Sequence, residues 1–105
     1  MNRETIVRFH IDDLKVGYEL AEIARNSFLQ NYIKNQFDVV KSNFDFDFFT
    51  DFDLAFAYAV DLVLFIKTSK IINDNENKDY FYGRLKELCE VFPDLLGKSE
   101  IREVL

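Results

Sequence analysis

The sequence contains few of the residues that make tight turns, crosslinks or metal sites. Among 105 residues it has one proline, three glycines, one cysteine, one histidine and no tryptophan. So few turn-forming residues argue against an all-β fold with many tight turns. The single cysteine, Cys89, excludes a disulfide within the chain and a zinc site built on cysteines. The single histidine, His10, excludes a metal site built on several histidines.

Long apolar segments are also missing. The first residues, MNRETIVRFHIDD, lack the apolar run and the small-residue cleavage site of a signal peptide. The longest apolar stretch extends from Leu54 to Ile66 and is interrupted by Asp61. It is shorter than the roughly 20 residues that a membrane-spanning helix requires. The sequence therefore predicts a soluble, cytoplasmic protein without a membrane partner.

Negative charge is in excess over positive charge. The formal net charge is −6 and the isoelectric point is near 4.7. Because like charges repel, this balance disfavours direct binding to nucleic acid or to anionic membranes. It is compatible with a basic protein partner, and it is equally an ordinary charge for the solubility of a small domain.

What the chain has in abundance is apolar and aromatic residues. They make up 49% and 16% of the sequence, which is enough for one hydrophobic core at this length. The richest stretch, residues 44–68, reads FDFDFFTDFDLAFAYAVDLVLFIKT. Phenylalanine alternates with aspartate at its start, and an almost unbroken apolar run follows. We expect residues 1–105 to form a single helical domain organised around this stretch.

Apolar periodicity predicts a mostly α fold with three main helices over residues 13–35, 51–70 and 78–92. Thr50 is suited to cap the second helix, with Asp53 completing a capping box. Pro93 is expected to end the third helix, and Ser99 to cap a short C-terminal one. No internal repeat is evident in the sequence.

Two short segments are candidates for a minor two-stranded β element. In residues 5–11 the apolar residues Val7, Phe9 and Ile11 alternate with polar ones, which fits a half-buried strand. Residues 44–48 alternate strictly between phenylalanine and aspartate. A helical turn over 5–11 and an extended loop over 44–48 are the competing interpretations.

Nothing in the sequence indicates catalysis. There is no glycine-rich phosphate loop, and neither Cys89 nor any serine lies in a recognisable nucleophile motif. Neither DFDFFTDFD nor NDNENKD follows the calcium-loop pattern. We therefore expect no enzyme activity, no cofactor and no metal. A metal-dependent enzyme that uses the aspartates is the least favoured alternative.

The main candidate for a binding surface is an acidic cluster at the start of the apolar stretch. Closely spaced carboxylates can present a row of negative charge to a basic partner. The simpler interpretation is that some cap the following helix and the others lie on the solvated face of a strand. The acidic cluster consists of Asp45, Asp47, Asp51 and Asp53.

Four further residues are candidates for contact with a partner. Asp61 interrupts the apolar run and shares a helical face with Tyr58, so it either pairs within the protein or lies on an interface stripe. Tyr80 and Tyr82 flank Phe81, and three successive rings cannot all face one core. Ordinary packing with one exposed ring is the alternative for this trio.

These observations favour a small acidic protein-binding module. The specific hypothesis is an inhibitor of a basic or nucleic-acid-processing protein, as immunity proteins, antitoxins and phage anti-defence proteins are. The alternative is a self-associating structural or adaptor protein, a homodimer, because residues 44–65 carry more large rings than one small core obviously needs.

Overall fold

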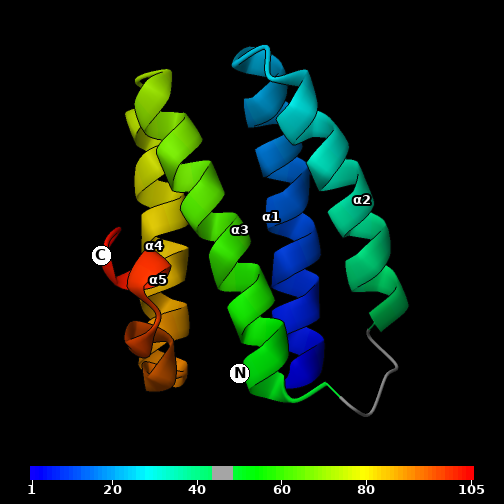
Figure 1. Cartoon of the computed structure of the whole chain (residues 1–105), viewed down its shortest axis with the longest axis vertical. Coiled ribbons are helices and arrows are strands. Elements are labelled where there is room, and N and C mark those ends of the chain that lie inside the picture. Colours follow the sequence, from blue (N-terminus) through cyan, green and yellow to red (C-terminus); the bar gives the residue numbers. More distant parts are fainter. Residues whose placement is uncertain (44–48) are drawn as a thin grey trace. The chain divides into compact units, whose positions relative to one another are not determined.

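The computed structural model describes residues 1–43 and 49–105, and helices account for all the regular structure in these two ranges (Figure 1). This confirms the predicted mostly α class. The elements, in chain order, are α1 (Arg3–Ile23), α2 (Ser27–Asn43), α3 (Asp51–Ile71), α4 (Asn75–Val91), the 3₁₀ helix η1 (Pro93–Gly97) and α5 (Ser99–Arg102).

The predicted strand over residues 5–11 is wrong, because this segment belongs to α1. The side chain of Asn2 caps the helix by accepting a 2.9 Å hydrogen bond from the amide of Thr5. Ile6, His10 and Leu14 then follow at helical spacing, and all three are buried. Packing of this helical face outweighs the strand preference of β-branched residues. The second candidate strand, residues 44–48, lies outside the described residues.

The predicted helix over residues 13–35 is in fact two helices, so the described chain has four long helices rather than three. Residues 24–26 separate them. Arg25 takes the left-handed conformation, with φ at 55°, and the amide of Asn26 donates to the carbonyl of Ala21 at 2.9 Å. The side chain of Asn26 then accepts a hydrogen bond from the amide of Leu29 at 3.0 Å and caps α2.

The other helices begin and end close to where the sequence predicts them. The capping box at the start of α3 is confirmed: the amide of Asp53 donates to Thr50 Oγ1 at 3.1 Å, and the amide of Thr50 donates to Asp53 Oδ2 at 2.9 Å. Pro93 follows the end of α4, and the short C-terminal helix is α5. The prediction that Ser99 caps α5 is wrong, because Ser99 is its first residue and Lys98 occupies the cap position without a side-chain hydrogen bond. None of the helices in residues 1–43 and 49–105 is long and apolar enough to span a membrane.

Contacts divide the chain into two compact units, Met1–Leu54 and Ala55–Leu105. In the first unit α1 and α2 form a helical hairpin, with Leu14, Ala21 and Ile33 fully buried (Figure 1). Arg3 forms an ion pair with Asp51 at 3.5 Å and donates a hydrogen bond to the carbonyl of Phe49. These contacts connect the start of α1 to the residues that lead into α3.

The second unit is built on α3 and α4. The rings of Phe65 and Phe81 contact each other, with centroids 5.2 Å apart, and neither side chain is exposed. Leu95 of η1 and Ile101 of α5 are also fully buried. The C-terminal segment is therefore an integral part of the apolar interior of this unit.

The helix pair α3–α4 forms a second hairpin, with helices of the same lengths in the same order as α1–α2. The helices α1 and α3 have 21 residues each, and α2 and α4 have 17 each. Both pairs begin 48 residues apart, at Arg3 and Asp51 and at Ser27 and Asn75. The sequence does not reveal this repeat, since few corresponding positions are identical. Over the four helices and the two turns they are Asp13 and Asp61, Leu14 and Leu62, Ile23 and Ile71, and Tyr32 and Tyr80.

Candidate protein-binding surface

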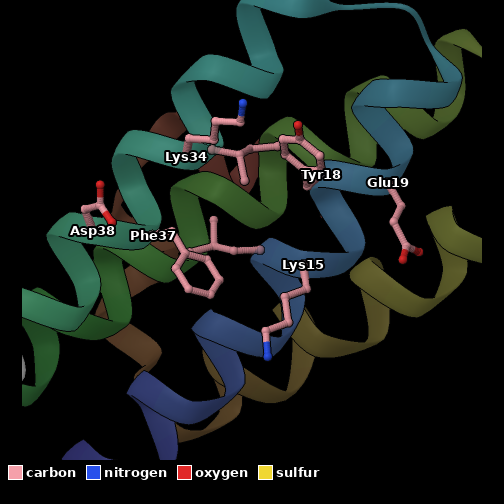
Figure 2. A pocket seen from close by; sticks show the side chains of 8 residues that line it. Lys15, Tyr18, Glu19, Lys34, Phe37 and Asp38 are labelled. Atoms are coloured by element: carbon pink, nitrogen blue, oxygen red, sulfur yellow. The ribbon is translucent and has the colours of Figure 1, made fainter.

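An open groove of about 520 Å³ lies along the α1–α2 hairpin (Figure 2). Residues three or four positions apart lie on the same face of a helix. Four residues from each helix therefore line the groove. The lining residues are Leu14, Lys15, Tyr18 and Glu19 of α1 and Ile33, Lys34, Phe37 and Asp38 of α2. We call this feature the α1–α2 groove.

The α1–α2 groove has an apolar floor and a charged rim. Leu14 and Ile33 are buried, whereas the rings of Tyr18 and Phe37 are half-buried. Figure 2 shows these two rings between the amino groups of Lys34 and Lys15. The carboxylates of Glu19 and Asp38 lie at the outer edges. The exposed rim thus carries both signs of charge.

Cations lie over both rings of the groove. The amino nitrogen of Lys34 is 5.7 Å from the centre of the Tyr18 ring, and that of Lys41 is 4.5 Å from the centre of the Phe37 ring. Such contacts are weak at exposed sites, at about 0.5–1 kcal/mol. An incoming apolar side chain can therefore displace the lysines from the rings at little cost.

A second hollow of about 390 Å³ lies nearer the N-terminus on the same hairpin. Its lining residues on α1 continue the three- and four-residue spacing of those in the α1–α2 groove, so both hollows lie along one stripe of this helix. They are Glu4, Val7, Arg8, Ile11 and Asp12, with Lys41 from α2.

The structure describes two of the four residues of the predicted acidic cluster. Asp51 and Asp53 are exposed in the first turn of α3, where Asp51 pairs with Arg3 and Asp53 completes the capping box. The hydrogen bond from the backbone of Thr50, together with that from its side chain, holds the pKa of Asp53 below its usual range. Both residues therefore have a structural role at the helix start. Asp45 and Asp47 lie outside the described residues.

Tyr58 and Asp61 do not lie on the surface where the interface interpretation required them. Their exposed fractions are 1% and 0%, because α3 is buried almost all round at this level. Asp61 has an interaction partner, as the large cost of burying a lone carboxylate demands. Neither residue therefore belongs to the candidate surface.

The two tyrosines of α4 differ from each other. Tyr80 is 42% exposed, and its ring and that of Phe81 form a T-shaped pair with a centroid distance of 5.3 Å. It remains a candidate for contact with a partner. Tyr82 is half-buried, and its hydroxyl donates a hydrogen bond to the carbonyl of Leu105 at 3.4 Å. Tyr82 therefore fastens the C-terminus of the chain to α4.

Metal-ligating side chains and the single cysteine are the remaining candidates for chemistry in residues 1–43 and 49–105. Within these ranges no three or more His, Cys, Asp or Glu side chains are placed to hold a metal ion together. Cys89 is buried, and desolvation raises the pKa of its thiol. Burial and a raised pKa both make the thiol a poor nucleophile.

The α1–α2 groove could not be recognised from the sequence without the break at residues 24–26. Leu14 and Tyr18 belong to an apolar stripe that is visible in the sequence, but Ile33 and Phe37 complete the groove only because the chain reverses direction between them. Asn26 was the available signal, since asparagine caps helices well. No glycine or proline marks the same turn.

Comparison of the chain with protein-family models, with curated proteins and with solved structures finds no match in any of the three.

Proposed function

We propose that this protein is a protein-binding module of the inhibitor or immunity type, without catalytic activity, and that it binds its partner through the α1–α2 groove. The observation that carries the proposal is the groove itself, an apolar floor with two accessible rings inside an exposed charged rim. Aromatic rings in such a setting are typical anchors of protein interfaces.

A basic cytoplasmic partner fits the charge of the chain. The net charge of −6 and the exposed carboxylates at the start of α3 support electrostatic steering toward such a partner. Steering acts mainly on the association rate and weakens with salt. The groove supplies the short-range contacts, and the acidic cluster supplies the attraction at longer range.

The test is affinity capture from the cells that make the protein, with wild type and Phe37→Asp compared quantitatively. A charge inside the apolar groove should abolish the retention of a specific protein. Val39→Asp is the matched control, because it introduces the same charge at an exposed apolar position of α2 outside the groove. A partner that is retained equally well by Phe37→Asp would overturn the groove as the binding site.

The acidic cluster is tested separately on the captured partner. Replacement of all four aspartates by asparagine should lower the association rate and flatten its dependence on salt, because the charge that attracts the partner is removed. Stopped-flow or biosensor kinetics at several salt concentrations measure both quantities. An unchanged rate and salt slope would refute the steering role.

Self-association is the second candidate, and the turn of the first hairpin favours it. Ile23 and Phe28 flank this turn and are 66% and 84% exposed. Apolar side chains that lie together at the surface often mark an interface. Light scattering at two concentrations distinguishes a mass near 12.5 kDa from its double. Phe28→Ser should return a dimer to monomer if this turn forms the contact.

A further inference from the structure

In the second hairpin, the C-terminal segment of the chain covers one face of α3 and α4. Leu95 and Ile101 of this segment are fully buried. The amino nitrogen of Lys98 lies 5.2 Å from the centre of the Phe56 ring of α3, and the terminal carbonyl of Leu105 accepts the hydrogen bond from Tyr82 of α4. Figure 1 shows η1 and α5 folded back beside α4.

The face covered by this segment corresponds to the face that carries the α1–α2 groove. On α4, Tyr82 and Lys86 line a hollow shared with the C-terminal segment, and they correspond to Lys34 and Asp38 of the groove in the 48-residue register. On α3, Ile66 lines a hollow with Val104. It corresponds to Tyr18. Both helices of the pair therefore present the same face in the two hairpins.

Side chains on the face that the C-terminal segment covers are more buried than the corresponding side chains of the α1–α2 groove. Ile66 and Leu85 in the second hairpin are almost fully buried, whereas the corresponding Tyr18 and Phe37 are half-buried. The difference has a simple origin in the chain. After α4 the chain folds back as η1 and α5. Among the described residues of the first unit, 1–43 and 49–54, no element corresponds to η1 and α5.

We propose that the α1–α2 groove binds a short amphipathic helix of the partner protein, in the way that the C-terminal segment lies on α3 and α4. This inference rests on the proposed function and names the part of the partner that the groove accepts. The helix inserts two aliphatic side chains from one face onto the floor formed by Leu14, Ile33 and Phe37. In the second hairpin the same part is played by Leu95 from η1 and Ile101 from α5, two short helical elements in succession.

The charge of the groove also matches such a helix. The rim carries Lys15 and Lys34 together with Glu19 and Asp38. The C-terminal segment likewise carries both signs, with two basic residues (Lys98 and Arg102) and three acidic ones (Asp94, Glu100 and Glu103). A mixed rim selects a helix whose outer positions are charged with both signs rather than a strongly acidic or basic one.

The test uses two defined probes on the intact protein. One is a fluorescein-labelled peptide of residues 93–105, PDLLGKSEIREVL, and the other is a displayed library of 13-residue helical peptides. The proposal expects enriched peptides with two aliphatic anchors on one face, and dissociation constants in the micromolar range. Hydrogen exchange on the complexes should show protection in α1 and α2 and none added in α4.

Two variants localise the binding. Phe37→Asp should weaken the binding of the selected peptides by about tenfold or more, and Val39→Asp, the same charge at an exposed position of α2 outside the groove, should leave it unchanged. Because Phe37 is half-buried, a second variant leaves that ring unchanged: Lys34→Cys in a Cys89→Ser background, labelled with a pyrene maleimide that fills the groove. The same label on Asn35→Cys, an exposed position one residue further along α2, is its control. Binding must be lost with the first label and kept with the second.

The outcomes separate this inference from the function on which it rests. Selected peptides that bind the groove and displace the captured partner support both. If a partner is captured through the groove but no helical peptide binds or competes with it, the module function stands and the helix proposal is overturned. Peptides that protect α3 and α4 instead of α1 and α2 also overturn it, since they would have replaced the C-terminal segment.

Discussion

Arg25 and Asn73 occupy the same position in the two helix-to-helix turns, 48 residues apart, and share the left-handed backbone conformation with φ of 55° and 58°. Each is followed by a residue whose side chain caps the next helix, Asn26 in one turn and Asp74 in the other. The amides of these two capping residues donate to the carbonyls of Ala21 and Ser69, each at 2.9 Å. The two turns therefore make equivalent hydrogen bonds from different residues.

Arg25→Gly should stabilise the protein. Residues with a β-carbon adopt the left-handed conformation at a cost of about 1 kcal/mol, which glycine avoids, although glycine also gains entropy in the unfolded chain. We expect a gain of up to about 1 kcal/mol in the free energy of unfolding from urea titrations. Asn73→Gly should raise the free energy of unfolding by less, because asparagine tolerates the left-handed conformation well.

The control for this substitution is Glu22→Gly, at an exposed position in the last turn of α1. Glycine there should destabilise the protein by up to about 1 kcal/mol. Equal effects of the two glycines would contradict the left-handed turn.

Gly83→Ala should also stabilise the protein. Gly83 is exposed in the interior of α4, and an added β-carbon would meet no atom within 4 Å. The expected gain is about 0.5–1 kcal/mol, from helix propensity and the smaller entropy of the unfolded chain. Gly97→Ala is equally free of clashes but lies at the end of η1, so its gain should be smaller. Melting temperatures compare the two variants.

The capping box at Thr50 and Asp53 predicts a dependence of stability on pH. The pKa of Asp53 is lower in the folded than in the unfolded state, so its contribution is complete above the unfolded pKa of about 3.9 and is lost as the pH falls through the folded value. Asp53→Asn should therefore be less stable than wild type at pH 6, and the gap should narrow toward pH 2. Asp12→Asn, an exposed change within α1, serves as the control.

The Phe65–Phe81 contact should be measurable by a double-mutant cycle. Both rings are fully buried with their centroids 5.2 Å apart. Each single change to leucine should cost about 1–3 kcal/mol, and the coupling between them should be about 0.5–1.5 kcal/mol. Strictly additive costs in urea titrations would argue against direct contact of the rings. Phe28→Leu, at an exposed ring, should change stability little.

Cys89 should react slowly with a thiol reagent such as DTNB. Its thiol is buried and its pKa is raised by desolvation, so both access and the thiolate fraction are low. The native protein at pH 8 should react at least about tenfold more slowly than the protein in urea, and the native rate should continue to rise above pH 9. Asn35→Cys in the Cys89→Ser background should react rapidly and show that the reagent is not limiting.

Local sequence signals predicted the structure well where one residue decides the outcome. Thr50 and Asp53 define the start of α3, and Pro93 defines the end of α4. These local signals failed where tertiary packing determines the secondary structure. The alternation of Val7 with its neighbours suggested a strand, but the buried helical face that includes Ile6 determines the structure.

The candidate site was less predictable than the fold. The turn at Arg25 has neither glycine nor proline, so one long helix was predicted, and the pairing of Tyr18 with Phe37 across a groove was not visible. The sequence was also insufficient to decide the role of Asp61. The sequence identified it as unusual, but only the structure shows that it is buried rather than presented to a partner.

The two three-residue turns have a consequence for the speed of folding. Each turn joins two helices that are consecutive in sequence, so the contacts near the turn form between residues that are close together along the chain. Such local topologies close small loops and fold in microseconds to milliseconds. Each hairpin can therefore acquire its turn and the adjoining helical turns early. The C-terminal segment contacts α3 as well as α4, because Lys98 lies over Phe56, so its docking closes a longer loop and should come later.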